Sequence, residues 1–182
     1  MLPTIIFLAG TAILIWLSRK ALRAPGRHGF YRFFAWEAIL VLFVLNQEPW
    51  GRDPFAPHQV VSWILMTISI LLVHQGLSLL RRNGQASEER SDNALYEFEK
   101  TTSLVTEGIY RHIRHPMYAS LLALAWGAYF QNPTWVGSGV AVTASFFLLL
   151  TAKADEQECL AYFGHAYADY MRRTRRFIPG IF

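Results

Sequence analysis

The residues best suited to chemistry form a dense polar and aromatic run at 104–118, Leu-Val-Thr-Glu-Gly-Ile-Tyr-Arg-His-Ile-Arg-His-Pro-Met-Tyr. Pro116 has no backbone N–H but is tolerated in the first turn of a helix, so the pattern predicts a helix that starts there. Arg114 and His115 would then lie at a helix N-terminus. Free N–H groups and the helix dipole at such a position favour an anion, for example a carboxylate.

Two tyrosines of the same run, Tyr110 and Tyr118, could contact a ligand. Each offers a hydroxyl group and an aromatic face, which suit stacking on a purine or contact with a sulfonium. Gly108 allows a backbone turn that a side chain would block. The run therefore predicts a compact binding segment.

A second polar cluster, Asp155-Glu156-Gln-Glu158, follows a long apolar stretch. Acidic side chains here suit an amine, a ribose diol or a cation. They could instead cap a helix formed by the C-terminal tail, because carboxylates stabilise the first turn of a helix. The cluster by itself leaves both interpretations open.

The elements that must position these residues are apolar segments long enough to cross a membrane. Hydrophobic residues make up 53% of the 182 residues and charged residues 16%, whereas soluble domains average about 25% charged. A membrane span needs about 20 mostly apolar residues, and the segment 61–73 is apolar on nearly every side, unlike a soluble amphipathic helix. The sequence predicts an all-α, polytopic membrane helical bundle of about five transmembrane helices. The predicted spans are 2–17, 30–45, 60–80, 117–130 and 134–152.

The basic residues predict how the bundle is oriented. Every lysine and arginine except Arg52 lies in 18–32, in 81–115 or after residue 152. The positive-inside rule makes these segments cytoplasmic, with the N-terminus outside and the C-terminus inside. We expect a protein of the cytoplasmic (inner) membrane of a prokaryote, with its site facing the cytoplasm.

One domain, 1–182, is expected. Its predicted parts are three helices (1–80), a cytoplasmic segment (81–115), a helical hairpin (116–152) and a cytoplasmic tail helix (153–182).

Other function classes are disfavoured. Basic residues that sit between apolar blocks face anionic lipid, so no nucleic-acid partner is expected. Cys159 is the single cysteine, which excludes an internal disulfide and a cysteine metal cluster, and no metal site is expected. A transporter or channel subunit would need a polar stripe along several spans, and few polar residues interrupt them. The oligomeric state is not predicted.

Taken together, the two clusters resemble the isoprenylcysteine carboxyl methyltransferase family of integral-membrane methyltransferases and, more loosely, the phospholipid methyltransferases. The matching stretches are the run 104–118, the run 155–170 (Asp-Glu-Gln-Glu-Cys-Leu-Ala-Tyr-Phe-Gly-His-Ala-Tyr-Ala-Asp-Tyr) and 176–179 (Arg-Phe-Ile-Pro). The resemblance implies an S-adenosylmethionine-dependent methyltransferase acting on a lipid-like acceptor, with S-adenosylhomocysteine as product. The alternative is a non-catalytic binding or assembly protein that retains the fold.

The resemblance also implies the residues of the cofactor site. The residues expected to line the adenosine part are Thr102, Ser103, Leu104 and Val105. Those expected to hold the ribose and methionine parts are Tyr110, His115, Pro116, Met117 and Tyr118. Asp155 and Glu156 take the place of the family's acidic pair, where an anion suits the positively charged amine or sulfonium.

The chain departs from the carboxyl methyltransferases at one informative position. These enzymes carry an arginine about one helical turn before the acidic pair, thought to hold the substrate carboxylate. Here that residue is Thr151, with Lys153 as the nearest basic residue. The acceptor is therefore not identified as a prenylcysteine carboxylate.

Catalysis of methyl transfer depends mainly on positioning, and a general base is needed only for a protonated acceptor. The catalytic candidates are His115, Glu156 and Glu37. His112 and His74 are further titratable groups. Ionisable groups inside membrane spans are functional candidates by default, although Glu37 and His74 could instead be paired structurally or reach the interface.

Overall fold

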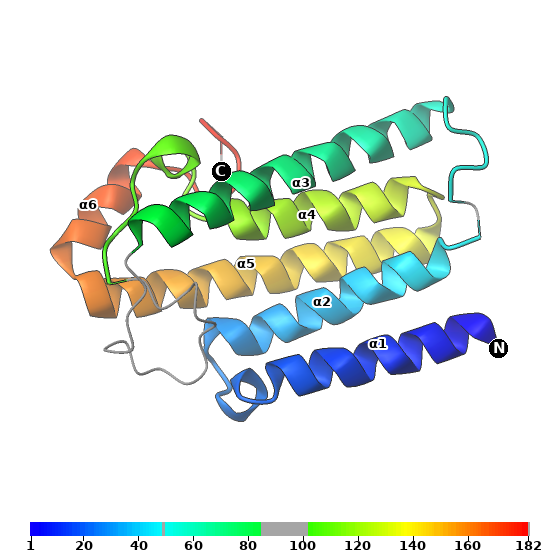
Figure 1. Cartoon of the computed structure of the whole chain (residues 1–182), viewed down its shortest axis with the longest axis horizontal. Helices are drawn as coiled ribbons and strands as arrows, with labels where there is room; N and C mark the ends of the chain where they lie inside the picture. The colour runs from blue at the N-terminus through cyan, green and yellow to red at the C-terminus, as the bar shows by residue number, and fades with distance from the viewer. Residues whose placement is uncertain (49, 85–101, 182) are drawn as a thin grey trace.

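The structure, a computed structural model, describes residues 1–48, 50–84 and 102–181, and every long element in them is a helix (Figure 1). The α-helices are α1 (Leu2–Ser18), α2 (His28–Leu45), α3 (Pro57–Asn83), α4 (Pro116–Phe130), α5 (Trp135–Phe163) and α6 (His165–Arg173). In the connections that the structure describes, Ala21–Arg23 form the 3-10 helix η1 and Gly108–Arg111 form the 3-10 helix η3. Residues 85–101 of the predicted cytoplasmic segment 81–115 lie outside the described residues.

The predicted helical membrane bundle is confirmed. The helices α2, α3 and α5 are long and apolar enough to cross a membrane, and α1 is a shorter apolar helix. The helix α4, with 15 residues, runs beside α3 and α5 (Figure 1). The 29 residues of α5 span about 44 Å at 1.5 Å per residue, more than the hydrocarbon core of about 30 Å.

Small residues let the central helices approach closely. Buried alanines form much of the contact between α2, α4 and α5, as is typical of membrane helices, and Gly127 of α4 packs against Ser62 and Met66 of α3. The buried alanines of this contact are Ala38, Ala125, Ala128, Ala141 and Ala144. At the other side of the bundle α1 packs on α2, where Gly10 makes room for Leu40. The helix α1 therefore lies at the edge of the bundle (Figure 1).

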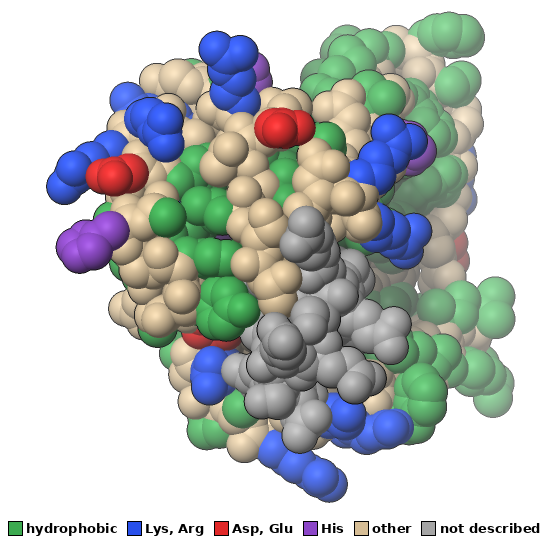
Figure 2. Space-filling model, turned by 60° about the vertical axis from the view of Figure 1, so that its left-hand side comes forward, with side chains coloured by type: hydrophobic (Ala, Val, Ile, Leu, Met, Phe, Trp, Pro, Cys, Tyr) green, Lys and Arg blue, Asp and Glu red, His purple; other side chains and the backbone are tan. Residues whose placement is uncertain are grey.

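The connections that carry the basic residues gather at one end of the bundle. The turn between α1 and α2, the end of α3 and the whole of α6 lie there, whereas Arg52 lies in the connection at the opposite end (Figure 1). Seen with that end brought forward, lysine and arginine side chains ring the surface, and apolar side chains cover the receding flank (Figure 2). We call this the basic end of the bundle.

The fifth helix is longer than predicted. It continues past Ala152 to Phe163, where Gly164, with φ of +58°, ends it and starts α6. The acidic cluster therefore lies inside a helix, and the interpretation that it caps a tail helix is wrong. Its last member, Glu158, instead accepts the backbone N–H of His28 at the start of α2, with a distance of 3.0 Å.

Candidate functional site

A cavity of about 330 Å³ lies at the basic end, between α2, α3, α4, α5 and α6. Aromatic and apolar side chains make up most of its wall, and a few ionisable groups reach it. The polar and aromatic lining residues are Arg32, Trp36, Tyr110, Arg114, His115, Tyr118, Ser120, Asp155, Cys159, Phe163, Tyr167 and Tyr170. The remaining lining residues are Val73, Leu80, Leu104, Val105, Pro116, Met117 and Leu121.

His115 is fixed by the start of α4 and by the C-terminal tail. It is the residue that precedes Pro116, the first residue of α4, as the sequence predicted. Its backbone N–H donates to the carbonyl of Arg176 at 3.2 Å, and the N–H of Arg114 donates to the carbonyl of Arg175 at 2.7 Å. Before this point the chain turns at Gly108, where φ is +56° and an added Cβ would lie 2.6 Å from Leu79. The tail therefore lies directly along the binding segment.

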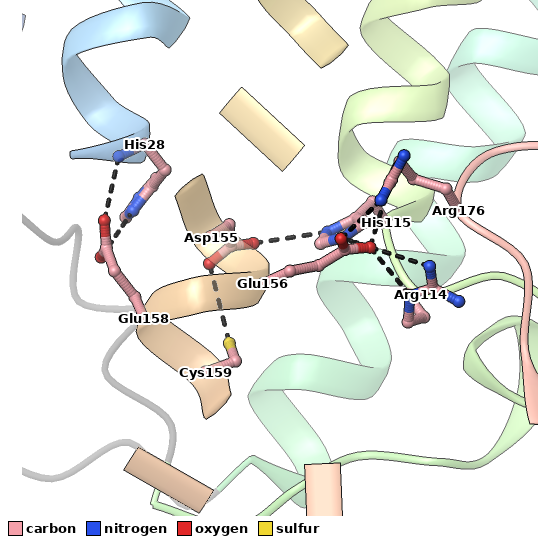
Figure 3. A network of polar contacts seen from close by, with 8 residues as sticks. All are labelled: His28, Arg114, His115, Asp155, Glu156, Glu158, Cys159 and Arg176. Carbon is pink, nitrogen blue, oxygen red and sulfur yellow. Dashed lines mark hydrogen bonds and ion pairs between the residues drawn. The ribbon is translucent and has the colours of Figure 1, made fainter. Parts of the chain in front are cut away.

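The two ring nitrogens of His115 face two different carboxylates (Figure 3). Nδ1 lies 3.4 Å from Oδ2 of Asp155, and Nε2 lies 3.3 Å from Oε1 of Glu156. The His115 side chain is 4% exposed, whereas that of Asp155 is 24% exposed and reaches the cavity. The adjacent acids of α5 thus hold the imidazole from both sides.

This arrangement favours the charged form of His115. Burial alone lowers the pKa of an imidazole, but the hydrogen bonds to Asp155 and Glu156 outweigh burial and raise the pKa of His115 above its ordinary value of 6.5. An imidazolium donates from both nitrogens, which is what two facing carboxylates require. The geometry and the raised pKa therefore both favour a protonated His115 that bridges Asp155 and Glu156.

Glu156 is held by two arginines in addition to His115. Its Oε1 accepts from Nε and Nη2 of Arg114 at 3.0 and 2.8 Å, and its two oxygens accept from Arg176 at 3.0 and 2.6 Å. Its side chain is 6% exposed and does not line the cavity. These contacts join α5, the segment that precedes α4 and the C-terminal tail (Figure 3).

Tyrosines form the aromatic part of the wall. The ring of Tyr118 stacks on that of His115, with centroids 5.3 Å apart and planes inclined by 21°. The hydroxyl of Tyr170 donates to the carbonyl of Tyr110 at 2.7 Å, which joins α6 to the binding segment. Burial raises the pKa of Tyr110, Tyr167 and Tyr170, so these hydroxyls are neutral at physiological pH.

The structure brings together most of the predicted cofactor-binding residues. Those that line the cavity are Leu104, Val105, Tyr110, His115, Pro116, Met117, Tyr118 and Asp155. Thr102 and Ser103 lie next to the cavity-lining residues in the chain, but their backbone N–H groups donate to the carbonyl of Gly84 and their side chains are not part of the wall.

Other candidates lie elsewhere. Glu37 faces α1, where it accepts a hydrogen bond from the Thr11 hydroxyl at 2.9 Å, and it does not line the cavity. His74 and His112 are exposed on the surface and are also absent from the cavity wall. None of the three is placed to act on a ligand in this cavity.

Several lining residues were not predicted from the sequence. Arg32 and Trp36 come from α2, and Cys159, Phe163, Tyr167 and Tyr170 come from α5 and α6. The sequence feature that could have identified the lining residues of α2 was the charge of Arg32 at the start of an apolar segment. The three- and four-residue spacing of the aromatic residues from Phe163 onward was the signal for α6.

Comparison with known proteins gives a family match for the part of the chain that builds this cavity. Residues 58–169 match the family model described as phospholipid methyltransferase. The matched segment runs from α3 into α6 and includes His115, Asp155 and Glu156. Searches of curated proteins and of solved structures found no match.

Proposed function

Because the chain belongs to the phospholipid methyltransferase family, we propose that it transfers a methyl group from S-adenosylmethionine to a lipophilic acceptor dissolved in the membrane. Membership of the family indicates a methyltransferase that acts on lipid-related substrates. One observation carries the finer proposal: the cavity at the basic end joins a charged wall, made by His115 and Asp155, to aromatic and apolar walls inside a membrane bundle.

The residues of the cavity fit S-adenosylmethionine. A volume of about 330 Å³ is within the usual range for small-molecule sites, about 300–1,000 Å³. The Asp155 carboxylate suits a positively charged amine or sulfonium, and the faces of Tyr118 and Tyr167 suit a purine or the cation. When bound, the cofactor would supply an electrophilic methyl group and leave as a neutral thioether.

The contribution of the chain is positioning. Asp155 is the carboxylate that reaches the cavity, and His115 holds it in place from the buried side. Glu156 holds His115 through contacts that also tie down Arg114 and Arg176. We therefore assign Glu156 a positioning role, and we leave Glu37 out of the proposed reaction because it lies against Thr11.

The basic end is proposed to face the cytoplasm, where the water-soluble cofactor is available. The one-sided basic residues support this orientation. The acceptor would reach the cavity from the bilayer, so the two substrates would arrive from different phases.

Calorimetric binding of S-adenosylmethionine and S-adenosylhomocysteine to the detergent-purified protein tests the proposal. We expect His115→Ala and Tyr118→Ala to weaken binding by about tenfold or more, since each removes a packed wall residue worth at least about 1.4 kcal/mol. His112→Ala is the matched control, because His112 lies in the same segment but is exposed. Undiminished binding in both cavity variants would overturn the site.

Two further results bear on the function, one from the same calorimetry and one from a methyl-transfer assay. A folded, monodisperse wild-type protein that binds neither compound would overturn the methyltransferase proposal in favour of a non-catalytic assembly protein. Binding followed by transfer of the radiolabelled methyl group to membrane lipid would support it directly.

A further inference from the structure

The start of α2 is bound by a carboxylate that belongs to α5. Arg27 occupies the N-cap position of α2, and an arginine side chain has no acceptor atom for the free N–H groups of a helix start. Oε1 of Glu158 accepts the backbone N–H of His28 there, at 3.0 Å. The free N–H groups and the helix dipole favour a carboxylate at this position. Glu158 therefore caps α2 from a neighbouring helix.

The same carboxylate holds the His28 side chain. Oε2 of Glu158 lies 2.9 Å from Nδ1 of His28 and 3.5 Å from Nη1 of Arg27. The His28 side chain is 2% exposed and that of Glu158 is 12% exposed, so water screens their interaction little. Arg27 is 48% exposed and contributes less, because ion pairs at the surface are weak. We call the His28–Glu158 pair the α2 clamp (Figure 3).

The α2 clamp lies beside the acid that faces the proposed cofactor cavity. Glu158 follows Asp155 by three residues, so the two carboxylates lie on the same side of α5. Asp155 lines the cavity, whereas neither member of the clamp does. His28 also lies close enough to Asp155 for an electrostatic interaction between their side chains. The clamp therefore borders the site without contacting a ligand in it.

The helix that the clamp binds contributes to the cavity wall. His28, Arg32 and Trp36 are spaced by four residues and share one face of α2, and Arg32 and Trp36 line the cavity. The sequence of α2 lies outside the segment 58–169 that matches the family model. The family match by itself therefore indicates no role for this helix.

The clamp supplies a directional contact that apolar packing between α2 and α5 does not. The rings of Phe34 and Phe147, for example, stack with their centroids 5.1 Å apart. Within a bilayer such packing is not driven by the hydrophobic effect, because lipid tails are as apolar as the side chains. A hydrogen bond to the first N–H group of α2, in contrast, requires one position of the helix along its axis. The clamp therefore sets the depth of Arg32 and Trp36 in the bundle.

We propose that His28 and Glu158 are positioning residues of the proposed cofactor site: the α2 clamp fixes α2 against α5, so that Arg32 and Trp36 complete the wall that includes Asp155. The clamp thereby makes a helix outside the family-matched segment part of the site. The inference rests on the proposed function, because it adds positioning residues for the binding of S-adenosylmethionine.

Calorimetric titration of S-adenosylmethionine and S-adenosylhomocysteine into the detergent-purified full chain tests the clamp. Glu158→Ala removes both contacts and is expected to weaken binding by about fivefold to tenfold, within the range for residues that act without touching the ligand. His28→Gln keeps the backbone contact, so a smaller loss is expected. Because the pair acts as a unit, His28→Gln should add little in the Glu158→Ala background. The number of sites per chain should stay at the wild-type value, since a variant that merely unfolds loses sites and not affinity.

A second measurement follows the cavity wall without any cofactor. In protein labelled with 5-fluorotryptophan, the fluorine NMR resonance of Trp36 is assigned by its loss in Trp36→Phe. We expect this resonance to shift in Glu158→Ala and in His28→Gln, because both variants release the start of α2.

Asn46→Ala is the matched control. Asn46 ends the same helix and donates a buried hydrogen bond to the carbonyl of Ala128 on α4, about 15 Å from Trp36 along the axis at 1.5 Å per residue. This variant should leave the Trp36 resonance and the cofactor affinity unchanged. An equal loss of affinity in Asn46→Ala and in the clamp variants would show a general effect of stability and overturn the inference. Additive losses from His28 and Glu158, or an unmoved Trp36 resonance, would overturn it as well.

The wild type in the same titration separates this inference from the proposed function. A folded wild type that binds neither compound would overturn the proposed function. Wild-type binding that is undiminished in Glu158→Ala and His28→Gln would overturn the positioning role alone and leave the methyltransferase proposal intact.

Discussion

The imidazole of His115 is held between two carboxylates, and this favours its charged form. Both ring nitrogens already face an acid, Asp155 on one side and Glu156 on the other. A histidine that served as a general base would need one nitrogen directed at the acceptor. The geometry therefore favours a positioning role for His115, in which it orients the cavity-facing acid.

This charge predicts a pH dependence of stability. The pKa of His115 is raised above 6.5, so the folded protein binds this proton more tightly than the unfolded chain does. The stabilisation is complete below pH 6.5 and is lost as the pH rises through the folded pKa. We expect the apparent melting temperature of the wild type to exceed that of His115→Gln most below pH 6.5, and by a decreasing margin as the pH rises through the folded pKa.

His112→Gln is the control for this titration, because His112 is exposed and in the same segment. Thermal unfolding in detergent across the pH range is the measurement. A difference in melting temperature between the wild type and His115→Gln that does not change with pH would contradict the bridging cation.

At this scale the sequence predicted the residues of the binding segment and of α5 better than those of α2. Arg114 and His115 were located correctly because Pro116 marks the start of a helix whatever surrounds it. Glu37, a catalytic candidate from the sequence, lies against Thr11 and not in the cavity wall. Nearly all of its neighbours in the chain are apolar, so periodicity could not tell which side of the helix faces which partner. Arg32, one turn closer to the basic end, faces the cavity instead.

Among the elements, α5 and α6 depend on one glycine. Gly164 has φ of +58° and ψ of −130°, a combination that side chains strongly disfavour, and an added Cβ there would meet no other atom within 4 Å. The requirement is therefore one of backbone conformation alone. The sharp turn returns Tyr167 and Tyr170 to the cavity wall.

Gly164→Ala is expected to cost about 1–3 kcal/mol locally, the usual range for a strained backbone position. The strain should loosen α6, increase its cleavage by protease and weaken cofactor binding. Gly139→Ala is the matched control: Gly139 also has open space around it, has an ordinary helical backbone and lies toward the start of the same helix. Equal protease resistance of the two variants would contradict the prediction.

The elements themselves were predictable from apolar length, and their ends were less so. The tight connection at Gln131 and the helix start at Pro116 are local signals and were predicted correctly. The end of α5 was predicted too early, at Ala152. The charged residues Lys153 and Asp155 were taken to mark the end of the helix as well as the end of the membrane span. In the structure the helix continues past them, because its acids are bound by partners from α2, α4 and the tail.

At the scale of the whole molecule, the distribution of charge predicts orientation. The basic end includes Arg172, whose side chain is 81% exposed, and the opposite end includes Asp53 in an exposed connection. In a Cys159→Ser background, we expect Asp53→Cys to react with a membrane-impermeant maleimide applied to intact cells. Arg172→Cys should react only after the membrane is permeabilised.

Replacing Cys159 first is necessary because it is the single cysteine of the chain. Reaction of Arg172→Cys from outside intact cells would invert the proposed orientation and would place the proposed cofactor site on the side away from the cytoplasm.

The C-terminal tail, which the ribosome synthesises after all the long helices, completes the wall of the site. Arg175 and Arg176 lie along the binding segment, and Arg176 binds Glu156. All the long helices, α1 to α5, are synthesised before these contacts can form. Insertion into the bilayer and completion of the cavity at the basic end are therefore separate events in time, so a nascent chain can be integrated by the translocon before the proposed cofactor site is complete.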